Sequence, residues 1–477
     1  MREELLRIGG VARPGSGRST IVSPATGEPV ASVAVASASD VDEAVRAAQA
    51  AFAGPFGALA EHERQAILRR ASDLLAERVE DLARTITLEN GKPIRDARGE
   101  AARAWQTILF AAEEAKRIHG EVLPMGAARG GEGRIGFTLR KPIGVVAAIA
   151  PFNFPLNLVC HKVGPALAAG NTVVLKPSEN TPLSSFALAA VFEEAGLPPG
   201  ALNVVCGDAE TGEALVDHPG VAMITFTGSA AVGTRIRSRS GVRRTLLELG
   251  SNAPMIVFDD ADIGAALEAA VRGSFTYSGQ VCISIQRLLV QRPLFDPFVV
   301  RLAEAASALV VGDPLDEATH IGPMIDEDAA RRVESWVDAA VAGGARAECG
   351  GTRDGRFYAP TVLTGVKPDM DVVCNEIFGP VVSVMPFDGL DDAIAIANDS
   401  VYGLQAGVFT RDIDRAMRVA QRLDVGGLWI NDAPQTRFDH YPYGGMKSSG
   451  LGREGVRYAV EEMTETTFVG IKLGDAR

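Results

Sequence analysis

The chain has 477 residues, too many for one simple hydrophobic core, so we expect two or three lobes. Hydrophobic residues make up 47% of the chain and charged residues 22%, which is typical of globular proteins and argues against a disordered or membrane-embedded class. No apolar run reaches the roughly 20 residues that cross a bilayer. The first residues, MREELLRIGG, lack the order of a signal peptide. These features favour a cytoplasmic protein without a membrane partner.

Charge and cysteine content exclude further classes. Sixty acidic residues against 47 basic ones give a net charge of −13, which disfavours nucleic acid as a partner. An anionic small substrate stays open, because a local pocket can be basic on an acidic protein. No CxxC or HxxxH spacing marks a zinc site, so we expect no metal. Five widely spaced cysteines argue against a disulfide framework and permit a reactive thiol: Cys160, Cys206, Cys282, Cys349 and Cys374.

Hydrophobic periodicity divides the first half of the chain into two parts. From Asp40 to about His119, apolar residues recur at helical spacing, which predicts a helical layer. From Lys141, short β-branched runs alternate with helical stretches, which is typical of an α/β parallel sheet wound with helices. Ligands of such sheets bind beyond the carboxyl ends of the strands. Strands are expected at 143–150, 171–177, 201–207 and 221–228, and helices at 157–169, 182–195 and 210–217.

A second α/β section runs from about Ser251 to Lys447 and predicts a second lobe. Two stretches, 126–142 and 464–473, fit neither lobe, and we interpret them as strands that pair outside the main sheets. Exposed strand edges of that kind usually need a partner chain. The strands expected in the second lobe lie at 255–258, 287–290, 381–387, 407–409 and 427–431.

Two residues stand out as chemical groups. Cys282 follows a glycine-containing turn in YSGQVCIS, where a thiol can be held at a cleft, although a single cysteine is more often structural. Glu248 lies between leucines in TLLELG. Such a carboxylate either faces solvent or has a raised pKa suited to a general base.

Glycines and charged residues follow the predicted strands. Gly228, Ser229 and Gly233 come after a strand and before a helix, where backbone N–H groups can bind a phosphate. The pattern differs from GxGxxG, and an ordinary strand-to-helix turn is the alternative. Lys176 and Glu179, in LKPSEN, suit a ribose or phosphate, and otherwise form a solvated loop.

Taken together, the motifs resemble the aldehyde dehydrogenase superfamily over nearly the whole chain. The resemblance implies an α/β aldehyde dehydrogenase fold with a Rossmann-like cofactor domain over 1–117 and 141–250 and a catalytic domain over 251–450. It also implies a β-arm over 118–140 and 460–477 that builds a homodimer or homotetramer. The motifs, in family order, are PFNFP (151–155), LKPSE (175–179), FTGS (226–229), LELG (247–250), GQVC (279–282), NEIFGP (375–380) and PYGGMKSSG (442–450).

The resemblance also assigns roles at matching positions. Cys282 corresponds to the nucleophile that attacks an aldehyde, and Glu248 to the base that activates water for hydrolysis of the thioester. The Asn153 amide and the Cys282 backbone N–H are expected to hold the oxyanion. The predicted reaction is the nicotinamide-dependent oxidation of an aldehyde to a carboxylic acid.

Cofactor contacts follow in the same way. Lys176 and Glu179 resemble the family's adenosine ribose contacts, and Ser229 its pyrophosphate contact at the turn that contains Gly228 and Gly233. A carboxylate at 179 repels a 2′-phosphate, so NAD is favoured, while Lys176 leaves NADP possible. The sequence departs from the family at Ser251, where many members have glycine. Contacts to the nicotinamide ribose and ring are expected from Glu376 and Phe378.

Three basic residues occupy positions that line the substrate tunnel in the family: Arg103, His161 and Arg437, with His440 nearby. Two guanidinium groups and an imidazole suit an anionic aldehyde. The expected class includes succinic semialdehyde, phosphonoacetaldehyde and sulfolactaldehyde, followed by hydroxyaldehydes such as lactaldehyde. In the alternative, Arg103 pairs with Glu100 or another acidic neighbour on the helix surface, and Arg437 points out of a mobile loop.

Four other functions share part of this pattern. A CoA-acylating dehydrogenase is disfavoured by Glu248, because thiolysis needs no base there. A hydrolytic cysteine enzyme does not explain the nucleotide crevice, and a phosphorylating dehydrogenase would need a histidine beside Cys282. A catalytically silent scaffold has no physical need for Cys282, Glu248, Asn153 and Lys176 together.

Overall fold

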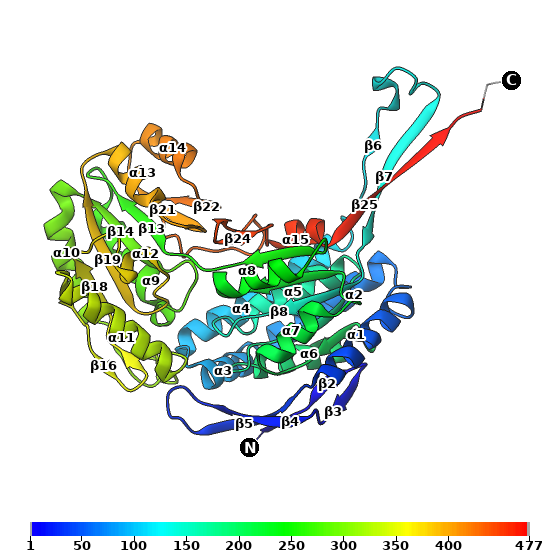
Figure 1. Ribbon diagram of the computed structural model, residues 1–477, viewed down its shortest axis with the longest axis horizontal. Helices are drawn as coiled ribbons and strands as arrows, with labels where there is room; N and C mark the ends of the chain where they lie inside the picture. The colour runs from blue at the N-terminus through cyan, green and yellow to red at the C-terminus, as the bar shows by residue number, and fades with distance from the viewer. Residues whose placement is uncertain (1, 475–477) are drawn as a thin grey trace.

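The structure is a computed structural model that describes residues 2–474. Figure 1 shows two α/β lobes facing each other and a long arm that projects from the lobe formed mainly by the first half of the chain. Each lobe is built around its own sheet, of eight strands in the first lobe and seven in the second.

The sheet of the first lobe has the order β24-β12-β11-β8-β9-β10-β2-β3. Its five central strands are parallel, and nearly all of their residues are buried, which explains their continuous apolar runs. Antiparallel strands close both edges. The bounds are β8 (Val145–Ile149), β9 (Thr172–Lys176), β10 (Leu202–Val204), β11 (Met223–Thr227), β12 (Arg244–Glu248), β24 (Gly450–Leu451), β2 (Leu6–Ile8) and β3 (Val11–Arg13).

Helices cover this sheet, and the expected helices over 157–169, 182–195 and 210–217 appear within a residue or two of those bounds. Helix α1 begins at a capping box formed by Ser37 and Asp40. The helices are α1 (Ala38–Ala53), α2 (Glu61–Glu77), α3 (Val79–Asn90), α4 (Ile94–Glu114), α5 (Asn157–Ala168), α6 (Leu183–Glu194), α7 (Ala209–Asp217), α8 (Ala230–Arg239) and α15 (Val456–Glu462).

The second lobe contains a sheet of order β15-β18-β19-β14-β13-β21-β22, parallel except for β15. All five strands expected here are present, and β15 and β18 add to them. The strands are β13 (Ala253–Val257), β14 (Ile285–Gln291), β15 (Arg346–Cys349), β18 (Thr361–Thr364), β19 (Val381–Phe387), β21 (Gln405–Phe409) and β22 (Gly427–Ile430). The helices are α9 (Ile263–Phe275), α10 (Arg292–Ser307), α11 (Glu327–Ala342), α12 (Asp371–Cys374), α13 (Leu390–Asn398) and α14 (Ile413–Arg422).

The arm is a sheet of three antiparallel strands: β6 (Val122–Leu123), β7 (Arg134–Pro142) and β25 (Thr464–Lys472). The two stretches that fitted neither lobe therefore pair with each other, as Figure 1 shows. The observed bounds of the arm differ from the predicted 118–140 and 460–477. Residues 456–462 form α15, which packs into the core of the first lobe, and β7 continues to Pro142.

The N-terminal residues form strands that the sequence patterns did not indicate. Strands β1 (Arg2–Glu4), β4 (Gly17–Val22) and β5 (Pro29–Val35) make a separate three-stranded sheet. Between Arg2 and Gly474, no helix is long and apolar enough to span a bilayer.

Candidate active site

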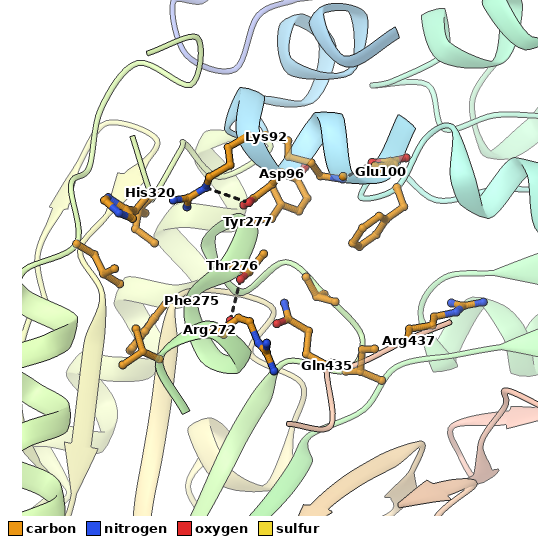
Figure 2. A pocket seen from close by; sticks show the side chains of 18 of the residues that line it. Lys92, Asp96, Glu100, Arg272, Phe275, Thr276, Tyr277, His320, Gln435 and Arg437 are labelled. Carbon is orange, nitrogen blue, oxygen red and sulfur yellow. Dashed lines mark hydrogen bonds and ion pairs between the residues drawn. The ribbon is translucent and has the colours of Figure 1, made fainter. Parts of the chain in front are cut away.

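Two cavities, of about 930 and 620 Å³, meet between the lobes. Cys282 and Leu158 line both of them, so the thiol lies at their junction. Figure 2 shows the larger one, here called the first cavity, with Glu100 on one wall and Gln435 and Arg437 on the opposite wall. The smaller one, the second cavity, lies beyond the carboxyl ends of β8, β9 and β11.

A strained turn carries Cys282 to this junction. Tyr277 and Ser278 have φ angles of 49° and 54°, and Gly279 has 66°, so three successive residues are left-handed. A Cβ atom on Gly279 would lie 2.0 Å from the carbonyl oxygen of Gly379. Only glycine fits there, and the turn cannot relax without moving Cys282.

Hydrogen bonds fix this turn to both lobes. The Tyr277 hydroxyl donates to the Asn90 carbonyl at 3.1 Å, and the Ser278 hydroxyl donates to the Gly322 carbonyl at 2.7 Å. The Gln280 side-chain oxygen accepts from the backbone N–H of Ile325 at 2.9 Å. Left-handed backbone that other contacts overdetermine in this way is typical of functional sites.

Asn153 lies against the same turn. Its side-chain amide donates to the Gln280 carbonyl at 3.0 Å, and its own carbonyl accepts from Lys92 Nζ at 2.8 Å. Lys92 pairs with Glu100, whose other oxygen accepts the N–H groups of Leu156 and Asn157 where α5 begins. A fully buried ion pair thus fixes the loop that contains Asn153.

Glu248 is the last residue of β12 and is 3% exposed. Neither carboxylate oxygen has a hydrogen-bond partner in the part of the chain that the structure describes, which is unusual for a buried polar group. Burial and the nearby Glu454 raise its pKa well above the usual range, while Arg437 and Lys162 oppose the shift. Glu248 is not among the side chains that line either cavity, yet its charge raises the pKa of Cys282.

Cys282 is partly exposed, and its thiol lies 3.2 Å from the Tyr443 hydroxyl. Burial raises the pKa of the thiol to about 11, and the hydrogen bond with Tyr443 and the charge of Arg437 oppose that shift. The Arg437 guanidinium lies over the Tyr443 ring, 3.6 Å from the ring centre.

Arg103 and His161 share one partner, Asp439. Arg103 donates to both Asp439 oxygens, at 3.2 and 2.6 Å, and His161 Nε2 lies 2.8 Å from the second of them. The partner of Arg103 is therefore not Glu100, which is occupied by Lys92. Arg103 lines the first cavity, whereas His161 is 1% exposed and is not part of its lining, so in this structure His161 contacts Asp439 and not the cavity.

Arg437 also lines the first cavity and is held by a buried carboxylate. Its Nη2 donates to Glu454 at 2.9 Å, and Lys162 Nζ donates to the other Glu454 oxygen at 3.0 Å. The Arg437 side chain is 6% exposed, so it does not point out of a mobile loop. Its Nε is buried and has no hydrogen-bond partner among residues 2–474.

The second cavity gathers most of the residues expected to bind a cofactor: Lys176, Glu179, Gly228, Ser229, Glu376 and Phe378. Gly233 is the exception. It does not line the cavity, and a Cβ atom there would lie 2.4 Å from Leu249 Cδ2, so this glycine lets α8 pack closely on the adjoining segment.

The second cavity fits a dinucleotide in its chemistry. Ser229 is the N-cap of α8, so backbone N–H groups of that helix are directed to the cavity. The buried Thr227 hydroxyl has no partner, and a Cβ atom on Gly228 would lie 2.5 Å from the Phe226 ring. Within the described residues 2–474, the Lys176 ammonium group makes only a long hydrogen bond of 3.4 Å to the Pro177 carbonyl, so it can bind a ligand.

Glu376 and Phe378 line the second cavity from the second lobe. The Glu376 carboxylate accepts the backbone N–H of Ser251 at 2.9 Å, so the position where the chain departs from the family pattern contacts a residue that lines the second cavity. Burial raises the pKa of Glu376 to about 7. Phe378 has a φ of 47° and packs edge-on against Phe152.

Sequence patterns missed several buried charged groups: Lys92, Glu100, Lys162, Asp439 and Glu454. Lys162 lies in an apolar helix, VCHKVGPALAA, where a charge needs a partner, and this was a usable signal. No sequence signal points to Asp439 or Tyr443, because their partners lie more than 150 positions away in the chain. Within residues 2–474, no cluster of histidine, cysteine, aspartate and glutamate could hold a metal.

The chain belongs to the aldehyde dehydrogenase family, whose sequence pattern matches residues 12–469. 3-Sulfolactaldehyde dehydrogenase from Priestia aryabhattai is 51% identical over 454 residues, which are 95% of this chain and 94% of that protein. Aspartate-semialdehyde dehydrogenase 1 from Pseudomonas canavaninivorans is 43% identical over 449 residues, which are 94% of this chain and 95% of that protein.

Solved structures agree with this assignment. An NAD-dependent aldehyde dehydrogenase from Sinorhizobium meliloti has a TM-score of 0.96 at 40% identity, over 100% of this chain and 96% of that chain. An NADP-dependent enzyme from E. coli has the same TM-score and the same identity, over 99% of this chain and 98% of that chain. The predicted family, fold and enzyme class are confirmed.

Proposed function

We propose that this protein oxidises a short anionic aldehyde to a carboxylic acid with NAD, through a thioester on Cys282. The observation that carries the proposal is the position of Cys282 where two cavities meet. One cavity has the lining expected for a dinucleotide, and the other is lined by Arg103 and Arg437. A thiol at this junction can bond to an aldehyde carbon while that carbon faces the cofactor.

In the first step, the Cys282 thiol loses its proton to water, the thiolate sulfur bonds to the aldehyde carbon, and the carbonyl oxygen takes the electron pair of the broken carbon–oxygen π bond. The Asn153 amide, fixed beside the turn by Gln280, and the backbone N–H of Cys282 stabilise that oxyanion. A nicotinamide held in the second cavity would supply the oxidising chemistry, as the acceptor of a hydride from the same carbon. This leaves a thioester on Cys282.

Glu248 is the proposed base for hydrolysis of the thioester. Its raised pKa makes it a better proton acceptor once ionised, and its oxygens have no competing partner. It takes a proton from water, the hydroxyl oxygen bonds to the acyl carbon, and the carbon–sulfur bond breaks. A base at this position supports release of the acyl group by water and not by CoA, because thiolysis needs no base there.

NAD is the proposed cofactor because Glu179 lines the second cavity, where its carboxylate can accept hydrogen bonds from a ribose 2′-hydroxyl and repel a 2′-phosphate. The two solved relatives use NAD and NADP respectively, so relatives at this identity do not decide the preference. Lys176 beside Glu179 makes NADP the second choice.

An anionic substrate is supported by donors that remain free at the first cavity. Asp439 occupies Nε and Nη2 of Arg103, which leaves Nη1 for a ligand, and the Arg437 guanidinium adds a second positive charge to the lining of this cavity. The two curated relatives are named for sulfolactaldehyde and aspartate semialdehyde, which both contain an acidic group. Carboxylate and sulfonate aldehydes are therefore the proposed class.

The test measures absorbance of the reduced cofactor with anionic and neutral aldehydes and with NAD or NADP. The wild type should turn over anionic aldehydes with NAD, and Cys282→Ala should not. Glu248→Gln should give one reduced cofactor per subunit and then stop, because the thioester persists. Continued turnover of Glu248→Gln at the wild-type rate would exclude Glu248 as the base.

The substrate class has its own matched comparison. Arg437→Met should raise KM for anionic aldehydes at least tenfold relative to neutral ones, because a charge-assisted hydrogen bond is lost. Arg292→Ala removes a guanidinium that pairs with Asp388 on the surface and serves as the control. Equal effects of Arg437→Met on both aldehyde classes would contradict the proposed anion site, while the proposed dehydrogenase activity would stand.

A further inference from the structure

Tyr443 lies against the reactive thiol, and the sequence motifs assign it no role. Its hydroxyl oxygen is 3.2 Å from Cys282 Sγ, and this hydroxyl makes no other hydrogen bond among residues 2–474. Tyr443 is 2% exposed, so bulk water does not compete for the contact.

We propose that Tyr443 is a further catalytic residue whose phenol donates a hydrogen bond to the Cys282 thiolate before attack on the aldehyde and again when the thiolate leaves the acyl group. The inference rests on the proposed function of Cys282 as the nucleophile. No proton moves from Tyr443, because the phenol only shares its hydrogen with sulfur.

The direction of the hydrogen bond follows from the charge state of sulfur. A neutral thiol can donate or accept, but a thiolate has no hydrogen, so Tyr443 must then be the donor. Burial raises the pKa of Tyr443 well above its usual range, and the Cys282 contact adds to that shift. The phenol therefore keeps its hydrogen throughout the cycle.

The charges around the thiol make this donor important. Burial is the largest influence and raises the pKa of Cys282, and Glu376 and Glu248 add to that effect. The Tyr443 hydrogen bond is the largest opposing influence, followed by Arg437. A hydrogen bond to the charged form favours that form, so Tyr443 increases the population of thiolate.

The rest of the fold holds the Tyr443 hydroxyl in place. The backbone N–H of Tyr443 donates to the Glu454 carbonyl at 2.9 Å, and the Glu454 N–H donates back at 2.7 Å. The ring packs in a small buried cluster with Tyr277 and Val281, which flank the Cys282 turn, and the Arg437 guanidinium covers one face. Because Arg437 also pairs with Glu454, the donor and the cation are fixed together.

The experiment measures iodoacetamide alkylation of Cys282 in the full-length protein between pH 6 and 10.5, by mass spectrometry of the peptide that contains Cys282. Tyr443→Phe removes only the hydroxyl. The pKa of Cys282 should rise by about one unit, since hydrogen bonds to charged groups have about that strength, and the wild-type pKa of about 11 places the whole measured range on the acidic limb of the profile. At pH 8 the rate should fall about threefold, because the more basic thiolate is also more nucleophilic.

Tyr441→Phe is the matched control. Tyr441 lies two positions away, and its hydroxyl contacts the Thr436 carbonyl and the Gln405 amide instead of Cys282. This variant should keep the wild-type profile. In Tyr443→Phe, the acidic limb of kcat/KM should move to higher pH by the same amount as the alkylation profile, which a purely structural defect would not produce.

Two failures remain distinguishable. Identical alkylation profiles for wild type and Tyr443→Phe, or equal shifts in both tyrosine variants, would overturn the role of Tyr443 while aldehyde oxidation stands. Absence of cofactor reduction by the wild type with every aldehyde would overturn the proposed function itself, since alkylation requires neither aldehyde nor cofactor.

Discussion

Asp439 accepts hydrogen bonds from Arg103, His161 and Asn157, three side chains from α4 and α5. Desolvation alone would raise its pKa, but hydrogen bonding to His161 and the charge of Arg103 together hold the pKa well below the usual 3.8. One carboxylate therefore sets the position of a guanidinium at the wall of the first cavity. His161 acts behind that wall as a neutral donor, because burial lowers its pKa.

Asp439→Asn should lower the free energy of unfolding by about 2 kcal/mol at pH 7, because charge-assisted hydrogen bonds are lost. Since the folded pKa is depressed, the contribution of Asp439 is present above pH 3.8 and is lost as pH falls below it. Urea unfolding at pH 7, 5, 4 and 3.5 should show the difference between wild type and variant shrinking with pH.

Asp388→Asn provides the comparison for that experiment. Asp388 pairs with Arg292, but its side chain is 70% exposed, so solvent screens the pair and its loss should change stability little. A difference for Asp439→Asn that stays constant from pH 7 to 3.5, or that is no larger than the one for Asp388→Asn, would contradict the role assigned to Asp439.

At the scale of elements, the turn before β14 matters most for the site. It places Cys282 through three left-handed residues and through contacts to loops from both lobes. Single left-handed residues other than glycine occur elsewhere, as at Phe378, but the run of three successive left-handed residues lies in the segment that carries Cys282. This distribution is expected where function requires one unusual backbone conformation.

Gly279→Ala should therefore destabilise the protein more than an ordinary glycine substitution. Gly355 is the matched control, since its φ is +57° but nothing lies within 4 Å of an added Cβ atom. Gly355→Ala should lose about 1 kcal/mol from backbone strain alone. Gly279→Ala adds a clash with the Gly379 carbonyl and should lose at least twice as much, with slower alkylation of Cys282. Equal melting temperatures for the two variants would show that the turn relaxes freely.

The elements that could be predicted from sequence are those with buried, repetitive patterns. Strands β8, β9 and β11 are buried along their whole length, and their apolar runs were visible without any partner. Strands β1 to β5 were not expected, because three of them have only three residues each and their exposure is mixed. Short strands depend on tertiary pairing more than on local pattern.

The candidate site likewise contains residues that local motifs predict and contacts that no local motif predicts. Cys282, Glu248 and the glycines of the second cavity belong to local motifs and were found at once. The partner of Arg103 depends on Asp439, 336 positions away, and the partner of the thiol depends on Tyr443, 161 positions away. No local pattern encodes such contacts, so the sequence does not show that His161 is buried beside Asp439.

At the scale of the whole molecule, the arm exposes apolar surface. Strand β25 is nine residues long and lies at the edge of its sheet, with β7 on one side only. The register with β7 places Ile135, Leu139 and Ile471 on one face, where all three are more than 40% exposed. A long free edge beside an apolar face is typical of a surface that a second chain covers.

We therefore expect a homodimer or homotetramer in which the arm contacts a partner copy. Leu139→Glu with Ile471→Glu puts two buried charges into that interface and should dissociate the assembly, as measured by analytical ultracentrifugation at micromolar concentration. Val242→Glu changes a fully exposed residue of the first lobe and should sediment as the wild type does. A monomeric wild type, or an unchanged mass in the double variant, would show that the arm edge stays open in solution. Because the two cavities are complete within one chain, the dissociated variant should keep its Cys282 alkylation profile, and a changed profile would mean that a neighbouring copy shapes the Cys282 turn.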